Sequence, residues 1–425
     1  MTRRFASILA AAAVVALLGP ACGGPCRTMD AEWRALRARP AALTAAPHAR
    51  VQIPFSLANR LIADSLRPPP ELPMPLGRLG PLAPLVGDVR AIPREVTLGP
   101  SRTPGRVHVA VRIELADGTG PLLTVRGSGD VAPTLDRDGR LFLALDTAEL
   151  SRLEPELGPR AAEQLGAILE GRLPAALRAR TPRFVVDRVA AAVVEEAIDQ
   201  GYRLLRGALL PRLRDRTRIE VELPDVPLAR VAVATTPDAL ALDVFTTLPV
   251  RTGVAPAPPA PPDAILVQIA GDTATRAANW GIEHGALPPR YTRGMTPAAD
   301  GAYVPHFEWR AGDGTRPLVV HMFRVHGGCA HFAVGVQPRV EVVGGQVRAW
   351  TAHRRLEHAD GPLVLELLAR TKALVERGAS SSRQGPGSLR ITVGGREVTT
   401  RLVRAEVAGD ELRAEVAIEI AGGVV

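Results

Sequence analysis

The second half of the sequence gathers residue types that bind metals and carry out acid–base chemistry. Seven of the nine histidines lie there, and His321, His326, Cys329 and His331 form the densest group. Their spacing matches no common structural zinc pattern. On a strand, His321 and His326 would also point to opposite faces. We therefore predict ordinary strand and loop histidines, with no metal and no cofactor, and keep a metal-dependent hydrolase as an alternative.

Three other motifs suggest catalysis, and none has its required context. His353 and His358 are one residue too far apart for an inverted zincin motif. Residues 127–129, Gly-Ser-Gly, are followed by turn residues instead of the helix that a dinucleotide fingerprint needs. The serines at 380–382 lack a nucleophile elbow. We therefore predict no catalytic residue and no enzymatic activity.

The first 22 residues have the layout of a bacterial secretory signal. Arg3 and Arg4 precede the apolar run 5–18, and small residues stand just before Cys22. This segment resembles a lipoprotein signal, in which the cysteine is acylated. We predict a signal peptide over 1–21, with ordinary cleavage after Ala21 as the alternative to lipidation at Cys22. The protein would then be tethered at the periplasmic face of a bacterial membrane without spanning it.

The composition is that of a globular chain, with 46% hydrophobic and 23% charged residues. The net charge is +8, and Lys372 is the only lysine. The arginines are spread among acidic residues and form no basic block, so we predict that nucleic acid is not a partner.

Cysteine pairing is open at the level of the sequence. If Cys22 is acylated, Cys26 and Cys329 remain in an oxidising compartment and can form a disulfide. Alternatively, Cys329 is a small buried residue and Cys26 a free thiol in a loop.

A proline-rich stretch divides the chain. Residues 254–263 contain five prolines among Ala and Val and predict an extended, semi-rigid linker. We expect a tether over 22–48 and two domains, over 49–253 and 264–425.

The two halves begin alike. Val-Gln-Ile occurs at 51–53 and again at 267–269, and each predicts a short strand. Ser56 and Asp272 follow at the same offset and are good N-cap residues, so a short helix is expected after each strand.

The later order of elements also agrees between the halves. Alternating apolar residues over 107–113 and 141–145 predict strands, and residues 157–179 and 184–210 predict helices. In the second half, Asp313-Gly314 and Gly344-Gly345 indicate hairpins, and a helix is expected over about 361–377. The fold class is α+β, with two tandem domains, each a curved antiparallel sheet with a long helix packed across it.

This order of elements resembles the tubular lipid-binding (TULIP) superfamily, the fold of bactericidal/permeability-increasing protein. The resemblance rests on the Val-Gln-Ile starts, the helices that follow them and the element order of both halves. It implies a lipid or other apolar ligand between sheet and helix and no catalytic residue. The membrane is a predicted partner through the acyl anchor at Cys22.

The apolar faces of the predicted first domain supply the candidate lipid-binding residues. They are Val109, Val111, Leu143, Val189, Val193, Ile198 and Leu205. Acyl methylenes buried there would gain about 0.8 kcal/mol each. The alternative is a structural or interaction lipoprotein that docks an envelope protein partner on the same sheets.

Overall fold

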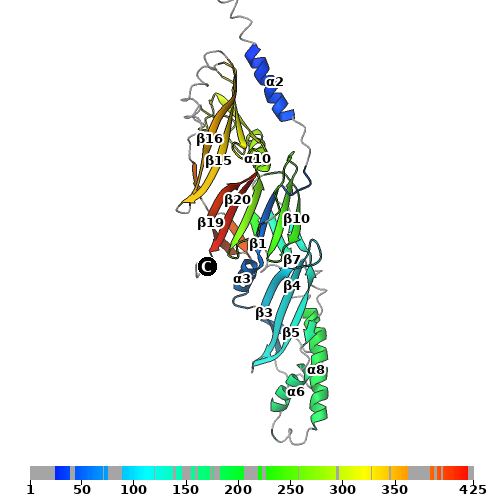
Figure 1. The fold of residues 1–425 in the computed structure, drawn as a ribbon. Helices are drawn as coiled ribbons and strands as arrows, with labels where there is room; N and C mark the ends of the chain where they lie inside the picture. The colour runs from blue at the N-terminus through cyan, green and yellow to red at the C-terminus, as the bar shows by residue number, and fades with distance from the viewer. Residues whose placement is uncertain are drawn as a thin grey trace, which may run out of the picture.

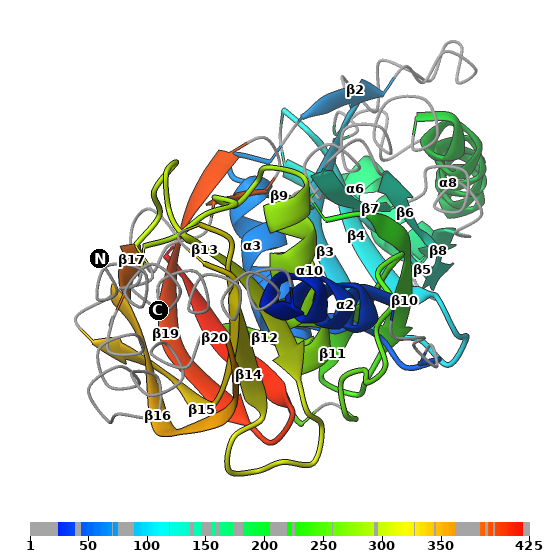
Figure 2. The ribbon, with the colours of Figure 1, turned by 90° about the horizontal axis from the view of Figure 1, so that it is seen from above.

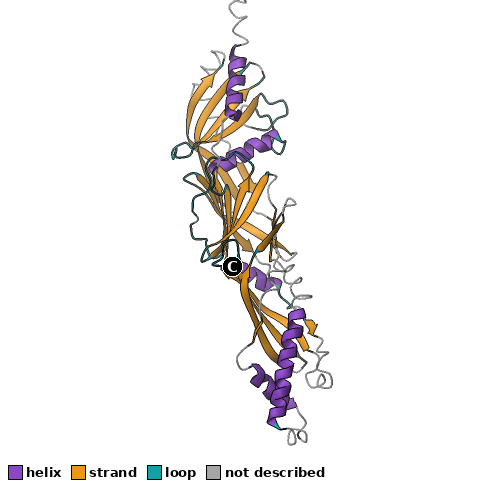
Figure 3. Ribbon diagram, turned by 90° about the vertical axis from the view of Figure 1, so that its right-hand side faces the viewer, coloured by secondary structure: helices purple, strands orange, loops and turns teal. Residues whose placement is uncertain are grey.

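The structure is a computed structural model. It describes residues 24–38, 44–69, 71–74, 89–118, 120–136, 140–145, 155–157, 161–172, 175, 182–204, 219–222, 226–256, 258–292, 296–326, 328–343, 346–361, 383–386, 390–393 and 396–419. The predicted signal peptide and Cys22 lie outside them. The described residues form an elongated molecule with three antiparallel sheets along its length, which confirms the sheet-rich α+β class (Figures 1 and 3).

One end of the molecule holds the first end sheet. Its strand order is β2-β3-β4-β5-β8. The bounds are Leu72–Met74, Val89–Pro100, Val107–Asp117, Gly120–Val131 and Pro155–Leu157. The strand predicted at 107–113 is confirmed as part of β4.

The other end holds the second end sheet, ordered β13-β14-β15-β16-β17. The bounds are Tyr303–Trp309, Leu318–Arg324, Ala330–Val343, Gln346–Asp360 and Arg383–Pro386. The predicted turn at 313–314 lies between β13 and β14, which pair antiparallel, as expected for a hairpin. Residues 344–345 lie outside the described residues, but β15 and β16 on either side of them also pair antiparallel, with Val343 opposite Gln346.

A ten-stranded central sheet lies between the two ends and takes strands from both halves. Its order is β10-β11-β1-β12-β20-β19-β18-β9-β7-β6. The first half supplies Ala49–Pro54, Pro133–Asp136, Arg140–Leu145, Ile219–Glu222, Leu228–Thr235 and Ala239–Thr246 (β1, β6, β7, β9, β10, β11). The second half supplies Ala264–Ala270, Arg390–Val393, Arg396–Ala408 and Glu411–Glu419 (β12, β18, β19, β20).

The two Val-Gln-Ile segments meet at the centre of this sheet. β1 pairs antiparallel with β12, and Val51 stands opposite Val267. Gln52 and Gln268 flank this pair and are both buried, and Gln52 Nε2 donates to Gln268 Oε1 over 3.2 Å. Each starting strand pairs on its outer side with the last hairpin of its own half, β11 or β20. A local two-fold axis therefore relates the two Val-Gln-Ile strands.

A short helix follows each of these strands: α3 (Phe55–Ser65) after β1 and α10 (Gly271–Glu283) after β12. The prediction that Ser56 and Asp272 are N-caps was wrong, because the caps are Pro54 and Ala270, and neither makes a side-chain capping bond. Ser56 and Asp272 are second in their helices. There the Asp272 carboxylate lies near the positive end of the helix dipole.

Each short helix is fastened to an end sheet by one asparagine. Asn59 Nδ2 donates to the carbonyl of Leu98 over 3.0 Å, and the Leu98 amide donates back over 2.7 Å. Asn279 makes the same two bonds with Phe307, both 2.8 Å long. These paired bonds satisfy backbone groups of β3 and β13 that would otherwise lack partners. The two halves thus repeat a contact as well as an element order.

Two further helices lie in the first half, and one of them, α8, is the longest helix in the described part of the chain. α6 spans Ala161–Arg172 and α8 spans Arg183–Leu204. The predicted start at 157 was wrong, since residues 155–157 form β8. Residues 205–210, and residues 362–377 of the helix predicted for the second half, lie outside the described residues.

The predicted tether contains a further helix, α2 (Gly24–Ala38), which lies alongside the second end sheet (Figure 2). Among the described helices, no segment combines the length and the hydropathy required to cross a bilayer.

Candidate functional site

Helix α2 is amphipathic and docks by its apolar stripe. Cys26, Met29, Trp33 and Leu36 recur at helical spacing. Met29 is 7% exposed, and the Trp33 ring meets Phe323 of β14 edge to face, with centroids 4.6 Å apart. The structure joins Cys26 to Cys329 in a disulfide. The N-terminal helix is therefore covalently fixed to a sheet about 300 residues away.

The face of the sheet beneath α2 carries histidines. The register pairs His306 of β13 with His321 of β14, and His321 with Ala333 of β15. Two residues along, Phe323 of β14 pairs with His331 of β15. Residues paired across antiparallel strands share a face, so His306, His321 and His331 lie together. All three are less than 9% exposed. His358 of β16 continues the row as the partner of Ala333.

A continuous chain of polar contacts crosses this face. Glu308 Oε2 lies 3.3 Å from His321 Nε2, and His321 Nδ1 lies 3.1 Å from His331 Nε2. His331 Nδ1 contacts Glu32 Oε2 of α2. The other oxygen of Glu32 lies 3.3 Å from His358 Nε2. His321 and His331 are thus linked between two carboxylates, and His358 contacts the second of these, Glu32, which is on α2.

Burial changes the protonation of this face. It lowers the pKa of His306 to about 4, and the neighbouring His321, Arg276 and Arg37 also disfavour the charged form, against a smaller opposite effect of Glu308. Burial also lowers the pKa of His331, although its hydrogen bond to Glu32 acts in the other direction. His306 is therefore a neutral ring in the folded protein at pH 7.

The structure assembles the predicted histidine group only in part. It brings His321 and His331 together. Cys329 is in the disulfide, so its sulfur is not a metal ligand. His326 is exposed and accepts a hydrogen bond from Arg290 Nη1 over 2.8 Å. The set of four ligands considered for a metal-dependent hydrolase is therefore not formed.

Sequence reasoning missed Glu32, His358 and Glu308 as members of this cluster. Glu308 could have been found, because the hairpin predicted at 313–314 requires a strand before it, on which His306 and Glu308 share a face. Glu32 could be found only by recognising α2 as an amphipathic helix. Nothing local in the sequence places that helix on β15.

The inner face of the first end sheet is apolar. On β4, Val107, Val109, Val111, Ile113 and Leu115 are all less than 9% exposed. Their cluster includes residues of α3, β3 and β5, and also Val186 and Ala190 of α8. Val109 and Val111, two of the predicted lipid-binding residues, therefore lie in this core. Helix α8 runs alongside α6 at this end of the molecule (Figure 1).

The other predicted lipid-binding residues are scattered. Leu143 is on β7 in the central sheet, not in the first end sheet. Val189, Val193 and Ile198 belong to α8, but the orientations of their side chains are not described. Leu205 lies just beyond the described residues.

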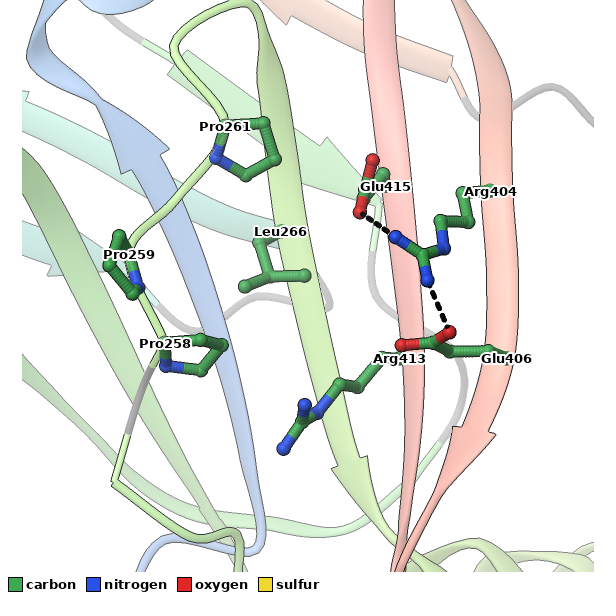
Figure 4. A pocket seen from close by; sticks show the side chains of 8 residues that line it. All are labelled: Pro258, Pro259, Pro261, Leu266, Arg404, Glu406, Arg413 and Glu415. Atoms are coloured by element: carbon green, nitrogen blue, oxygen red, sulfur yellow. Dashed lines mark hydrogen bonds and ion pairs between the residues drawn. The ribbon is translucent and has the colours of Figure 1, made fainter.

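Two surface hollows have charged linings. One, of about 170 Å³, lies between the proline-rich linker and the strands β12, β19 and β20 (Figure 4). On its strand side Arg404 bridges Glu406 (2.7 Å) and Glu415 (3.7 Å). The other, of about 310 Å³, opens over β3, β4 and β5 and includes Glu95, Arg112 and Arg126. Neither hollow has the lining of an acyl-chain site.

No protein-family model matches the sequence, and no curated protein does. Among solved structures, P47 from Clostridium botulinum A2 has a TM-score of 0.42 and 6% identity, over 88% of this chain and 97% of that one. P47 of Clostridium botulinum E1 has a TM-score of 0.42 and 5% identity, over 88% of this chain and 99% of that one. At this TM-score neither likeness bears on fold family or function.

Proposed function

We propose that this is an exported, lipid-anchored envelope protein that binds a lipid or other apolar ligand in its first half. The binding site would lie between the inner face of β3, β4 and β5 and helix α8. No cofactor and no covalent chemistry are involved in this proposal.

The observation that carries the proposal is the uninterrupted apolar face of β4. Every second residue from Val107 to Leu115 is a buried aliphatic side chain. At roughly 3.3 Å per residue, this 11-residue strand is about 36 Å long. A face of this length suits an extended acyl chain, because each buried methylene contributes about 0.8 kcal/mol without any directional contact.

Helix α8 has both buried and exposed apolar side chains among the residues whose burial is described. Val186 and Ala190 are 6% and 0% exposed, whereas the neighbouring Phe184 and Val185 are 67% and 36% exposed. Ala190 packs toward Gly166 of α6, so part of α8 contacts a helix and not the sheet. Val186 and Ala190 belong to the same apolar cluster as β4, so we propose that α8 covers the ligand on this face.

Two further observations support an envelope location. The sequence begins with the signal-like segment and Cys22, and a disulfide such as Cys26–Cys329 persists in oxidising compartments. The first half also has the element order of the TULIP superfamily that the sequence resembles: strand, short helix, antiparallel strands and long helix.

A fluorescent fatty-acid titration of two α8 variants tests the proposal. Val186→Glu places a charge at a buried position of α8, and we expect it to weaken binding at least tenfold. Val185→Glu makes the same chemical change on the exposed neighbour and should leave binding unaltered. Circular dichroism must show that both variants are folded. Equal binding by both variants, or no binding by the unmodified protein, contradicts the proposal.

A structural or interaction role is the second candidate, and the charged linings of both hollows favour it. The elongated molecule would then present its sheets to an envelope protein. Cross-linking in intact cells discriminates the two. A stoichiometric protein adduct without co-purified lipid supports docking, and lipid without such an adduct supports the first proposal.

A further inference from the structure

We propose that Glu32, His331 and His358 bind one divalent transition-metal ion, Zn²⁺ by the chemistry of its ligands, and that this ion joins α2 to the second end sheet. The site is separate from the apolar face discussed above and does not depend on lipid binding.

The three side chains form a ligand set suited to zinc. Two imidazole nitrogens and one carboxylate are ligands that Zn²⁺ accepts readily. Each residue offers a donor atom, and the three atoms all lie within 4.8 Å of one another. Ligands around tetrahedral zinc are about 3.3 Å apart. The 3.3 Å between Glu32 Oε1 and His358 Nε2 already meets this spacing.

Nδ1 is the nitrogen of His331 that is placed for a metal ion, because it faces the Glu32 carboxylate directly. A proton on Nδ1 makes this contact a hydrogen bond, and a metal ion that displaces the proton would use the same nitrogen. The other ring nitrogen, Nε2, lies 3.1 Å from His321 Nδ1, and His321 Nε2 lies 3.3 Å from Glu308 Oε2.

This arrangement matches the way proteins orient metal-binding histidines. A ligating imidazole usually donates its second N–H to a further acceptor, which fixes its tautomer and ring position. With the ion on Nδ1, His331 Nε2 would donate to His321 Nδ1, 3.1 Å away, and His321 Nε2 is itself 3.3 Å from Glu308 Oε2. His321 is therefore a positioning residue for His331 and not a ligand.

The location makes the site a cross-link between distant parts of the chain. Glu32 is on α2, whereas His331 and His358 are on β15 and β16. The Cys26–Cys329 disulfide fixes α2 nearby and reduces the ordering cost of bringing Glu32 to the histidines. Glu32 and His358 have 31% and 43% exposed side chains, so an ion can reach them from solvent.

The test is zinc titration of the purified full chain after chelator treatment, by calorimetry at pH 7.5. The variants are Glu32→Gln and His358→Gln, with His326→Gln as the matched control, because His326 is an exposed histidine outside the cluster. Cobalt is the spectroscopic probe, since its visible absorption reports the coordination geometry. A third variant, His321→Asn, tests the positioning role.

We expect one zinc per chain, with affinity reduced about 100-fold or more by Glu32→Gln and His358→Gln and unchanged by His326→Gln. Loss of an orienting partner typically costs 10–100-fold in affinity, which is the expectation for His321→Asn. Zinc should also raise the melting temperature of the unmodified protein and of His326→Gln, but not of His358→Gln. Absence of stoichiometric binding, or equal binding by all variants, overturns the proposal and indicates that a proton alone occupies the Glu32–His331 contact.

Discussion

Acid should destabilise the fold through His306. This side chain is 8% exposed, and burial lowers its pKa to about 4, against an ordinary value of 6.5. The unfolded chain therefore binds an extra proton between these two values, and stability falls as the pH drops through that window. The groups facing His306 are His321 on β14, Arg276 on α10, Arg37 on α2 and Glu308 on its own strand β13.

The magnitude follows from the size of the shift. A difference of about 2.5 pKa units corresponds to about 3 kcal/mol once the pH is below 4. At pH 5 the unfolded state is almost fully protonated and the folded state is not, so His306 alone should reduce the free energy of unfolding by about 2 kcal/mol relative to pH 7.

The assay is urea unfolding at pH 7 and pH 5 and constant ionic strength, followed by tryptophan fluorescence. Of the four tryptophans, Trp33 is on α2 and the other three are in the second half, so the signal reports the region around His306. His306→Phe keeps an aromatic ring but does not titrate. Its loss of stability between pH 7 and pH 5 should be smaller than that of the unmodified protein by about 2 kcal/mol. Equal losses in the two proteins would show that His306 does not cause the acid sensitivity.

Three further predictions concern the framework. Asn279→Ala leaves the amide and carbonyl of Phe307 without their side-chain partner, and we expect thermal or chemical unfolding to show a loss of about 1–3 kcal/mol; an unchanged midpoint would show that water replaces the asparagine. Replacing Cys26 and Cys329 together by Ser should lower the free energy of unfolding by about 2–5 kcal/mol, and the variant should have the same mobility on reducing and non-reducing gels. If a peptide map of the unmodified protein contains no cross-linked peptide, the disulfide is absent and the prediction fails. Gly271→Ala places a Cβ 2.1 Å from an indole carbon of Trp309 and should lower the free energy of unfolding by about 1–3 kcal/mol. Gly314→Ala is the control, because the added Cβ meets no atom within 4 Å and should leave the free energy of unfolding unchanged.

The duplicated framework could be predicted from the sequence because it depends on local patterns. Val-Gln-Ile at 51–53 and 267–269 predicted two equivalent strands, and the glycine-containing turns predicted the hairpins. The placement of the helix caps was wrong by two residues. Ser56 and Asp272 have the right chemistry for a cap, but the chain already enters the helix at Phe55 and Gly271.

The site beneath α2 could be predicted only in part, because its members are far apart in the chain. His321 and His331 are close through the turn between β14 and β15, so local reasoning places them together. Glu32 and His331 are 299 residues apart, and their contact depends on where α2 docks. Cys26 and Cys329 were the one indication of that docking, and sequence alone could not decide whether they pair.

Lipid binding is tested by native mass spectrometry of the protein purified from a bacterial envelope without added lipid. We expect a population heavier than the chain by the mass of one lipid, released by organic extraction and reduced in Val186→Glu. Repeated recovery of only ligand-free protein, identical for Val186→Glu and the unmodified chain, would contradict lipid binding.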